Sequence, residues 1–310
     1  MGSLDELLLT NVERGVKVAR DYHHYTPSLN VAFLITENLK LAAGAAKTLG
    51  RPDIANIIPN LVINEDDSDP NAPGSISSRN TALRPWTSQN YGLSLEYYFG
   101  NNSSASLGVF RNDITGFFVT PPATILTPET LTELGLDQRF AGWTLTGAPF
   151  NSASTARVTG LETGFSQGLG YLGAWARPIR LGANITLNQV EGAAGSNIET
   201  AVPKIGNLTF AYSRRPVVVR VNWNYRGNQR RGTLSGLGPG AYLFTAPQQQ
   251  LEASGEWQFS KHLSFSVTSR NLLKQSVVEH GYGSETPSYA RFRSATPMGR
   301  YYTFGLKGTY

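Results

Sequence analysis

The 310-residue chain has no cysteine, only two methionines and only 16% charged residues. The absence of cysteine excludes disulfides and thiolate chemistry. Uninterrupted apolar segments are also short, and none approaches the roughly 20 residues that a membrane-spanning helix requires. This does not exclude a membrane protein, because membrane-spanning β-strands alternate polar and apolar residues and keep a low average hydropathy.

The chain also lacks the short motifs of common enzymes and metal sites. No G-x-S-x-G, Walker A or zinc-binding pattern occurs, and the four histidines do not have metal-ligand spacing. The net charge is +5, but no basic cluster with interleaved aromatic residues indicates nucleic-acid binding. Glu162, Glu252 and Glu256 fall on polar faces of expected strands, where polar packing explains them better than a catalytic carboxylate pair. We therefore expect no enzyme activity, cofactor, metal or nucleic-acid partner.

What the chain does contain is clearest in its last eleven residues, 300–310. One set of alternating positions is mostly aromatic or apolar, namely Tyr302, Phe304, Leu306, Gly308 and Tyr310. The intervening set is mostly polar or small and includes Lys307. A period of two residues indicates a β-strand. Because one face is apolar along the whole segment and the other is polar, the pattern predicts a strand between lipid and a polar lumen.

Ten earlier segments alternate in the same way. Their apolar faces lie within residues 29–35, 39–45, 91–99, 107–109, 161–165, 181–187, 208–212, 217–225, 251–259 and 263–267. Tight turns are expected at 36–38, 100–102, 214–216 and 260–261, with an intermediate connection near 169–178. At the other end, long loops are expected at 49–87, 121–153 and 275–298, a longer connection at 228–243 and a moderate one at 191–200. Short turns at one end and long loops at the other are typical of outer-membrane β-barrels, whereas a β-sandwich gives no reason for such segregation.

Aromatic residues cluster near the ends of these predicted strands. Tyr97, Phe99, Trp257, Phe259 and Tyr310 fall at the short-turn end, and Trp223 and Tyr225 fall at the long-loop end. Two belts of aromatic residues at the two membrane–water interfaces would produce this placement.

The strand count is odd, which bears on domain organisation. If the last of eleven strands runs toward the periplasm, so does the first, whereas complete single-chain bacterial barrels have an even number of strands. Residues 1–10 also lack the basic start and the cleavage site of a secretory signal. The sequence therefore predicts that residues 25–310 form roughly the C-terminal half of a larger barrel. Residues 1–24 are expected to be a loop, or the remnant of an upstream extracellular loop.

Several segments resemble the TonB-dependent outer-membrane receptors. Residues 27–31 (PSLNV), 39–43 (LKLAA) and 47–52 (KTLGRP) are similar to the family's "PSLN … NLxLRxAxxKTxxRP" run. Residues 80–99 (NTALRPWTSQNYGLSLEYYF) are similar to its "NPxLKPWTSDNYDLSLEYYF" segment. Asn271-Leu272-Leu273 and the terminal strand resemble its closing pattern. Gly92 stands where the family has Asp, and Leu273 and Tyr310 stand where it has Phe.

This resemblance implies an all-β, antiparallel transmembrane β-barrel of about 22 strands, plugged by an N-terminal domain, of which about 11 strands and no plug are expected here. It implies the outer membrane of a Gram-negative-type bacterium and energised uptake of a scarce nutrient such as a siderophore, vitamin B12 or an oligosaccharide. The implied partners are outer-membrane lipid and lipopolysaccharide, the barrel-assembly machinery, a small nutrient ligand, and TonB only through the plug. Tyr302, Phe304, Leu306 and Tyr310 resemble the signal that the assembly machinery reads.

Ligand contacts are expected in the long loops. Residues 127–134 begin with a threonine, a proline and a glutamate, which predicts a short helix. Phe140 and Trp143 follow it, and they either stack on a ligand or, as we favour, pack the loop itself. Later loops carry basic and aromatic candidates for an anionic ligand or lipopolysaccharide phosphates, namely Arg230, Arg231, Tyr282, Arg291 and Arg293. Solvated loop charge is the alternative interpretation of these residues.

Two other functions are compatible with the alternation. One is a complete, porin-like barrel of about 12 strands, which needs a twelfth strand within residues 1–24. The other is a soluble β-rich carbohydrate-binding protein. A barrel needs detergent to stay in solution and a soluble lectin-like protein does not, so partitioning distinguishes them.

Overall fold

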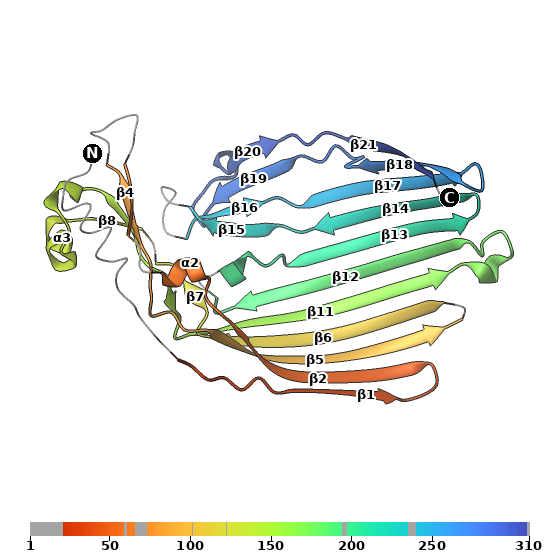
Figure 1. Cartoon of the computed structure of the whole chain (residues 1–310), viewed down its shortest axis with the longest axis horizontal. Helices are drawn as coiled ribbons and strands as arrows, with labels where there is room; N and C mark the ends of the chain where they lie inside the picture. The colour runs from red at the N-terminus through yellow and green to blue at the C-terminus, as the bar shows by residue number, and fades with distance from the viewer. Residues whose placement is uncertain are drawn as a thin grey trace.

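The computed structural model describes residues 21–58, 61–65, 73–100, 102–121, 123–193, 197–234 and 240–308. Eleven antiparallel strands form one sheet in sequence order (Figure 1). They are β1 (Ser28–Leu34), β2 (Leu39–Gly50), β5 (Trp86–Phe99), β6 (Ser103–Thr115), β11 (Thr155–Gly168), β12 (Ile179–Glu191), β13 (Lys204–Arg214), β14 (Val217–Arg226), β17 (Gln248–Gln258), β18 (Leu263–Arg270) and β21 (Tyr301–Gly308). Each predicted alternating segment is one of these strands, so the predicted all-β antiparallel fold of the barrel type is confirmed.

The sheet is open in this structure. Strand β1 pairs with β2 and strand β21 pairs with β18, and these two strands lie at opposite edges of the sheet (Figure 1). Within the described residues, no pairing joins β1 to β21. Because every neighbouring pair is antiparallel and the count is odd, β1 and β21 run in the same direction, toward the end with the short turns.

The outer face of the sheet is apolar over a height that suits a membrane. Leu93, Leu95 and Tyr97 of β5 are 47%, 39% and 46% exposed, although β5 pairs with a strand on each side. From Tyr91 to Phe99 a strand rises about 26 Å at roughly 3.3 Å per residue. At a tilt of 35–45° that is about 20 Å along the membrane normal, near the apolar band of about 25 Å found in such barrels.

The predicted aromatic pairs lie next to one another on this outer face. Tyr97 and Phe99 are stacked with ring centroids 5.4 Å apart, and Trp257 and Phe259 are 5.7 Å apart at the same turn end. At the loop end, the rings of Trp223 and Tyr225 are 6.0 Å apart. Leu306 and Phe304 of the terminal strand are also exposed on this face, and Phe304 stacks against Phe265 of β18. Tyr310 lies outside the described residues.

The long loops contain more regular structure than the sequence suggested. The segments after β2 and β6 form a small sheet of β3 (Leu61–Asn64), β4 (Ser75–Ser78), β8 (Thr124–Ile125) and β9 (Thr144–Thr146), near helix α2 (Ile54–Ile57). Strand β4 pairs with β9 in parallel, across the whole hairpin of β5 and β6. Such short strands pair with segments distant in sequence, and alternation alone does not detect them. Residues 21–27, which include the last four positions of the predicted N-terminal loop 1–24, contain no helix or strand, and residues 1–20 lie outside the described part.

The short helix predicted in the second long loop is present as α3 (Pro128–Leu134). The Thr127 hydroxyl accepts a hydrogen bond from the Thr130 N–H at 3.3 Å, and Gly135 ends the helix at φ 65°. Hydrogen bonds from its own backbone N–H and from the Thr127 hydroxyl lower the pKa of Glu129. No helix within the described residues has the length and apolar character required to cross a membrane.

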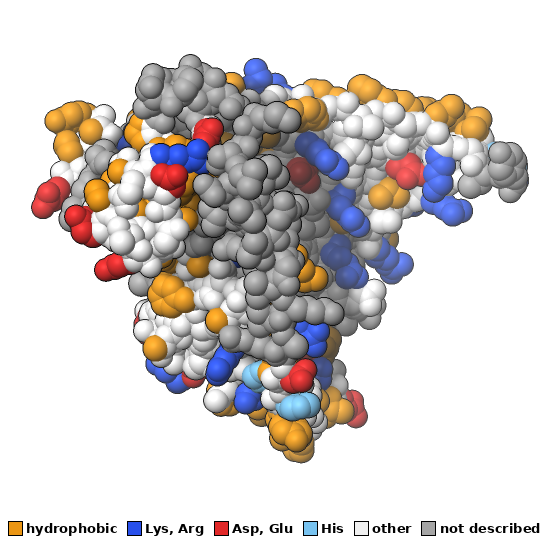
Figure 2. Space-filling view, turned by 60° about the vertical axis from the view of Figure 1, so that its left-hand side comes forward, with side chains coloured by type: hydrophobic (Ala, Val, Ile, Leu, Met, Phe, Trp, Pro, Cys, Tyr) orange, Lys and Arg blue, Asp and Glu red, His pale blue; other side chains and the backbone are white. Residues whose placement is uncertain are grey.

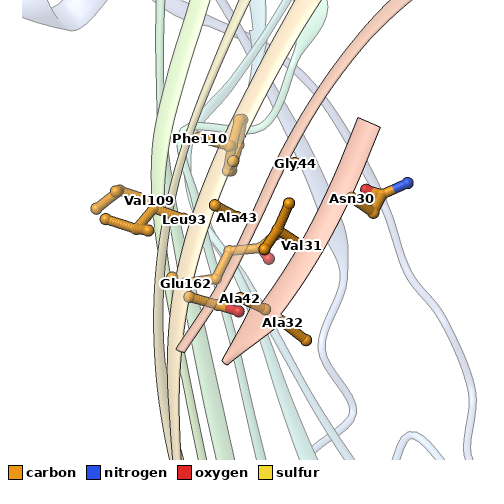
Figure 3. A pocket seen from close by; sticks show the side chains of 13 residues that line it. Asn30, Val31, Ala32, Ala42, Ala43, Gly44, Leu93, Val109, Phe110 and Glu162 are labelled. Carbon is orange, nitrogen blue, oxygen red and sulfur yellow. The ribbon is translucent and has the colours of Figure 1, made fainter. Parts of the chain in front are cut away.

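On the inner face of the eleven-stranded sheet, which we call the wall, glycines leave room for the ring of Phe110. In Figure 3, Leu93 and Val109 project to one side of the strands, and Asn30 and Glu162 project to the other. On this inner side Phe110 pairs with Gly92 on one neighbouring strand and with Gly160 on the other. A Cβ atom on Gly160 would lie 2.3 Å from Phe110 Cζ and 2.8 Å from the Leu187 carbonyl oxygen. Gly160 is therefore required by packing.

The two glycines beside Phe110 form a matched pair for testing this arrangement. We expect Gly160→Ala to lower the free energy of unfolding by about 1–3 kcal/mol, because the added methyl group collides with ring and backbone. Gly92→Ala should change it by less than about 0.5 kcal/mol, since a Cβ on Gly92 has no atom within 4 Å. Urea unfolding of the detergent-solubilised chain measures both. Equal effects of the two substitutions would contradict this packing.

Candidate ligand-binding surface

A four-stranded sheet extends the wall beyond the loop end of β14 and β17. It consists of β15 (Gln229–Thr233), β16 (Tyr242–Thr245), β19 (Val277–Tyr282) and β20 (Phe292–Thr296), paired in that order (Figure 1). Only Gly227 and Asn228 separate β14 from β15, and Ala246 and Pro247 separate β16 from β17. The position of this sheet is therefore fixed by the wall beneath it.

One face of this sheet carries a stack of arginines and aromatic rings. The Arg230 guanidinium carbon lies 3.1 Å from the centre of the Tyr242 ring, and Tyr242 pairs with Tyr282 on the next strand. Tyr282 is stacked on Phe244 with centroids 4.4 Å apart and an interplanar angle of 15°. The Arg291 guanidinium carbon lies 4.8 Å from the Tyr282 ring centre. Two guanidinium groups thus flank a continuous aromatic surface, which we call the Arg–aromatic stack.

Hydrogen bonds hold both guanidinium groups of the Arg–aromatic stack in place. Arg230 donates from a terminal nitrogen to Glu199 Oε1 at 3.2 Å, while its buried Nε has no acceptor among the described residues. Arg291 Nε donates to the Thr286 carbonyl oxygen at 3.1 Å. Because part of each guanidinium is still unbonded, the stack can offer further N–H donors to an anion.

The other two predicted arginines take different positions. Arg231 is exposed at a β-bulge, where the register between β15 and β16 shifts between Arg230 and Gly232. Arg293 lies over Gly281, because a Cβ on that glycine would be 2.7 Å from Arg293 Nε. Gly281 alternates with Tyr282, so Arg293 is on the opposite face from the stack. The structure therefore brings Arg230, Tyr282 and Arg291 together and separates Arg293 from them.

Asn271, in the motif-like segment after β18, anchors the base of the loop that carries β19 and β20. It adopts a left-handed conformation with φ 54° and is 8% exposed. Its side-chain amide donates to the carbonyl oxygens of Gln275, Met298 and Gly299, and its Oδ1 accepts from the Gln275 N–H. One side chain therefore joins the two ends of the loop.

Phe140 and Trp143 lie in a different loop and form part of its core. Phe140 is 1% exposed in a cluster with Ile76, Leu126 and Leu131, and Trp143 packs edge-on against it with centroids 4.9 Å apart. The buried ring of Phe140 has no surface left for a ligand in this arrangement. This placement agrees with the loop-packing interpretation that we favoured from the sequence.

Sequence reasoning missed three members of the site. Tyr242 and Phe244 alternate with Leu243 on β16, and Glu199 reaches Arg230 from the 3-10 helix η4 (Asn197–Thr200). The alternation of two aromatic residues over 242–244 was the available signal. This short segment overlaps the end of a longer loop that the sequence suggests at 228–243, so the alternation does not stand out as a strand.

These features define an open, antiparallel wall of the β-barrel type, with an apolar outer face and a smaller sheet at its loop end. The chain belongs to the TonB-dependent receptors: the family model described as "TonB dependent receptor-like, beta-barrel" matches residues 9–272. This is a family of outer-membrane receptors and transporters, not of enzymes. No curated protein matches the sequence.

Solved structures of siderophore receptors share the fold. The ferric enterobactin receptor PfeA of Pseudomonas aeruginosa is 18% identical, with a TM-score of 0.64 over 93% of this chain and 40% of its own. The siderophore receptor PirA of Acinetobacter baumannii is 19% identical, with a TM-score of 0.63 over 93% and 41%. FpvA of P. aeruginosa is 14% identical, with a TM-score of 0.61 over 94% and 33%. The chain thus spans less than half the length of the receptors it resembles.

The packing role of Phe140 can be separated from a role in ligand contact. Phe140→Ala should destabilise the loop by about 3–5 kcal/mol, because it removes a buried ring from a small cluster. Limited proteolysis should then cleave within residues 126–143 much faster than in the unchanged chain. Phe150→Ala is the control, since Phe150 is 45% exposed. Unchanged protease resistance in the Phe140 variant would show that its ring is not needed for packing.

Proposed function

We propose that this chain forms part of the wall of a receptor that takes up an anionic ferric siderophore across the outer membrane of a Gram-negative-type bacterium. The observation that carries the proposal is the Arg–aromatic stack at the loop end. Guanidinium groups bind carboxylates and other oxyanions strongly, and the rings beside them give planar apolar surface. Enterobactin and pyoverdines appear in the complexes of solved receptors with the same fold.

The stack favours this ligand class over the two others that the family resemblance implies. An oligosaccharide would use the rings of Tyr242, Phe244 and Tyr282 for stacking but would leave two guanidinium groups without a role. Vitamin B12 would likewise need few cationic contacts. An anionic chelate uses both features, so it accounts for more of the site.

We propose further that the wall is completed by additional strands, as part of a barrel of about 22. Among the described residues, β1 and β21 each pair on one side only. This supports the proposal, because unpaired backbone groups are too costly in hydrocarbon to persist. Since β1 and β21 run in the same direction, an antiparallel ring needs an odd number of added strands. A second copy on the same axis would bring β21 against β1 in parallel, which argues against a homodimeric barrel.

The remaining partners are proposed on the same basis. Energised uptake requires a plug through which TonB acts, and the exposed outer residues Tyr302, Phe304 and Leu306 suit recognition by the barrel-assembly machinery. Lipopolysaccharide phosphates would meet the outer rim above the apolar band. There Asp113 joins Arg111 at 2.7 Å and Arg157 at 2.8 Å, which holds both arginines in place.

A complete 12-stranded barrel is less well supported than this larger assembly. It would need a twelfth strand within residues 1–24 to lie between β1 and β21, which are at opposite edges of the described sheet (Figure 1). A soluble carbohydrate-binding protein does not account for the apolar outer face or for membership of the receptor family.

Ferric siderophore binding by the purified chain in detergent tests the proposal. A panel that includes ferric enterobactin should contain a ligand that quenches intrinsic fluorescence with saturation. Arg291→Gln should weaken its binding about tenfold, because a charge-assisted hydrogen bond is lost. Arg84→Gln, at an exposed arginine of the neighbouring loop with no side-chain hydrogen bond among the described residues, should leave binding unchanged. Binding that is insensitive to Arg291→Gln would refute the proposed site.

A further inference from the structure

The inner face of the wall carries its charge unevenly. On strands β1 to β11, the inner charged residues are Lys40, Glu96 and Glu162. On strands β12 to β21 they are Arg180, Arg220, Arg226, Arg270, Lys307, Glu252 and Glu256. The second half of the wall is therefore strongly basic on its inner face. On the hollowed surface visible beyond the loops in Figure 2, Lys and Arg side chains gather accordingly.

Two of these arginines frame a gap near the turn end. Arg180 pairs with Ala211 on β13, and Ala211 pairs with Arg220 on β14. The three residues form one row across three strands, with the smallest side chain in the middle. Neighbouring strands are about 4.8 Å apart, so the two arginines are anchored roughly 10 Å from each other. Two guanidinium groups at this separation can approach one anion held over the alanine.

A cavity of about 890 Å³ opens at this row. Arg180, Ala211 and Arg220 line it, together with Ser213 and with Arg177 from the turn after β11. The Arg177 stem is positioned by Gly170, since a Cβ on that glycine would lie 3.4 Å from Arg177 Cγ. The cavity is large enough for an organic anion with several carboxylate groups.

The arginines of this cavity are not neutralised within the wall. No acidic side chain lines the cavity, and the guanidinium groups of Arg177, Arg180 and Arg220 form no hydrogen bond or ion pair with other described residues. The nearest acids in the register are Glu256 and Glu252, which pair with Val218 and Asn222, each two residues from Arg220. Three like charges beside one cavity repel one another, and a bound anion relieves this repulsion. The semi-enclosed lumen strengthens the attraction between the arginines and the anion.

We propose that Arg180 and Arg220, with Arg177, form a second anion site on the lumenal wall, which binds a carboxylate of the cargo on its way to the periplasm. The proposal rests on the proposed function only in taking the cargo to be anionic. Membrane lipid is excluded as the occupant, because the row lies on the polar face opposite to the apolar band. The Arg–aromatic stack captures the ligand at the loop end, and this site receives it near the turn end.

Citrate, a small tricarboxylate, is the probe for this site. Isothermal titration of the full chain in detergent should give saturable citrate binding whose affinity falls as salt rises. Arg180→Gln combined with Arg220→Gln should weaken citrate binding by about tenfold or more. Arg214→Gln is the matched control, because Arg214 lies at the end of β13 on the outward face and is exposed. It should leave citrate affinity unchanged.

Two further variants separate the site from net charge and from the proposed function. Ala211→Leu keeps every charge but fills the gap between the arginines, so it should also weaken citrate binding. Arg291→Gln at the Arg–aromatic stack should leave citrate affinity at the lumenal site unchanged. The proposal is overturned if the double arginine variant binds citrate like the unchanged chain, or if Arg214→Gln has an equal effect. It is also overturned if Arg291→Gln alone abolishes citrate binding. That result would leave the proposed function intact, because it would place the anion at the Arg–aromatic stack.

Discussion

The structure depends on the pairing of backbone amides in a sheet that separates two solvents. In hydrocarbon an unpaired N–H or C=O costs several kcal/mol, so a strand is stable there only if neighbouring strands on both sides form hydrogen bonds with its backbone. Pairing fixes the register, and register fixes which side chains face lipid, because a slip of one residue would exchange the two faces. One inter-strand row, Ala43, Leu93, Val109, Leu161 and Leu187, is apolar across five strands. A basic residue at its centre would cost about 2–4 kcal/mol at the bilayer midplane.

The same rigid wall positions both anion sites. At the loop end, β14 and β17 continue almost directly into β15 and β16, so the Arg–aromatic stack is held by a sheet and not by a free loop. At the turn end, Arg180 and Arg220 are placed by the ladder itself, with Ala211 between them. Sites on paired strands hold their geometry more closely than sites on loops. A basic inner face along β12 to β21 connects the two regions.

The sequence predicts the wall well and the loop end poorly. Alternation predicts all eleven strands because each has one face in lipid and one in a polar lumen, which imposes a period of two on every segment. The capping signal at Thr127 and Pro128 predicts helix α3 for an equally local reason. The small sheets are different, since β4 and β9 are four and three residues long and their paired residues are 69 positions apart in sequence. In both small sheets the choice of strand partners depends on tertiary contacts that no local pattern encodes. The separation of Arg293 from Arg291 depends on the pairing of β19 with β20 in the second of these sheets.

The most direct test is to determine which face of strand β5 contacts lipid and which contacts water. The chain has no cysteine, so single cysteines at Leu93, Ser94, Leu95 and Glu96 of β5 can be introduced without further changes. In proteoliposomes, a charged thiol reagent should modify the cysteines at 94 and 96 and spare those at 93 and 95, which a lipid-soluble reagent should reach. Reaction with the charged reagent at all four positions, or at none, would contradict a wall with one face in lipid and one in a polar lumen.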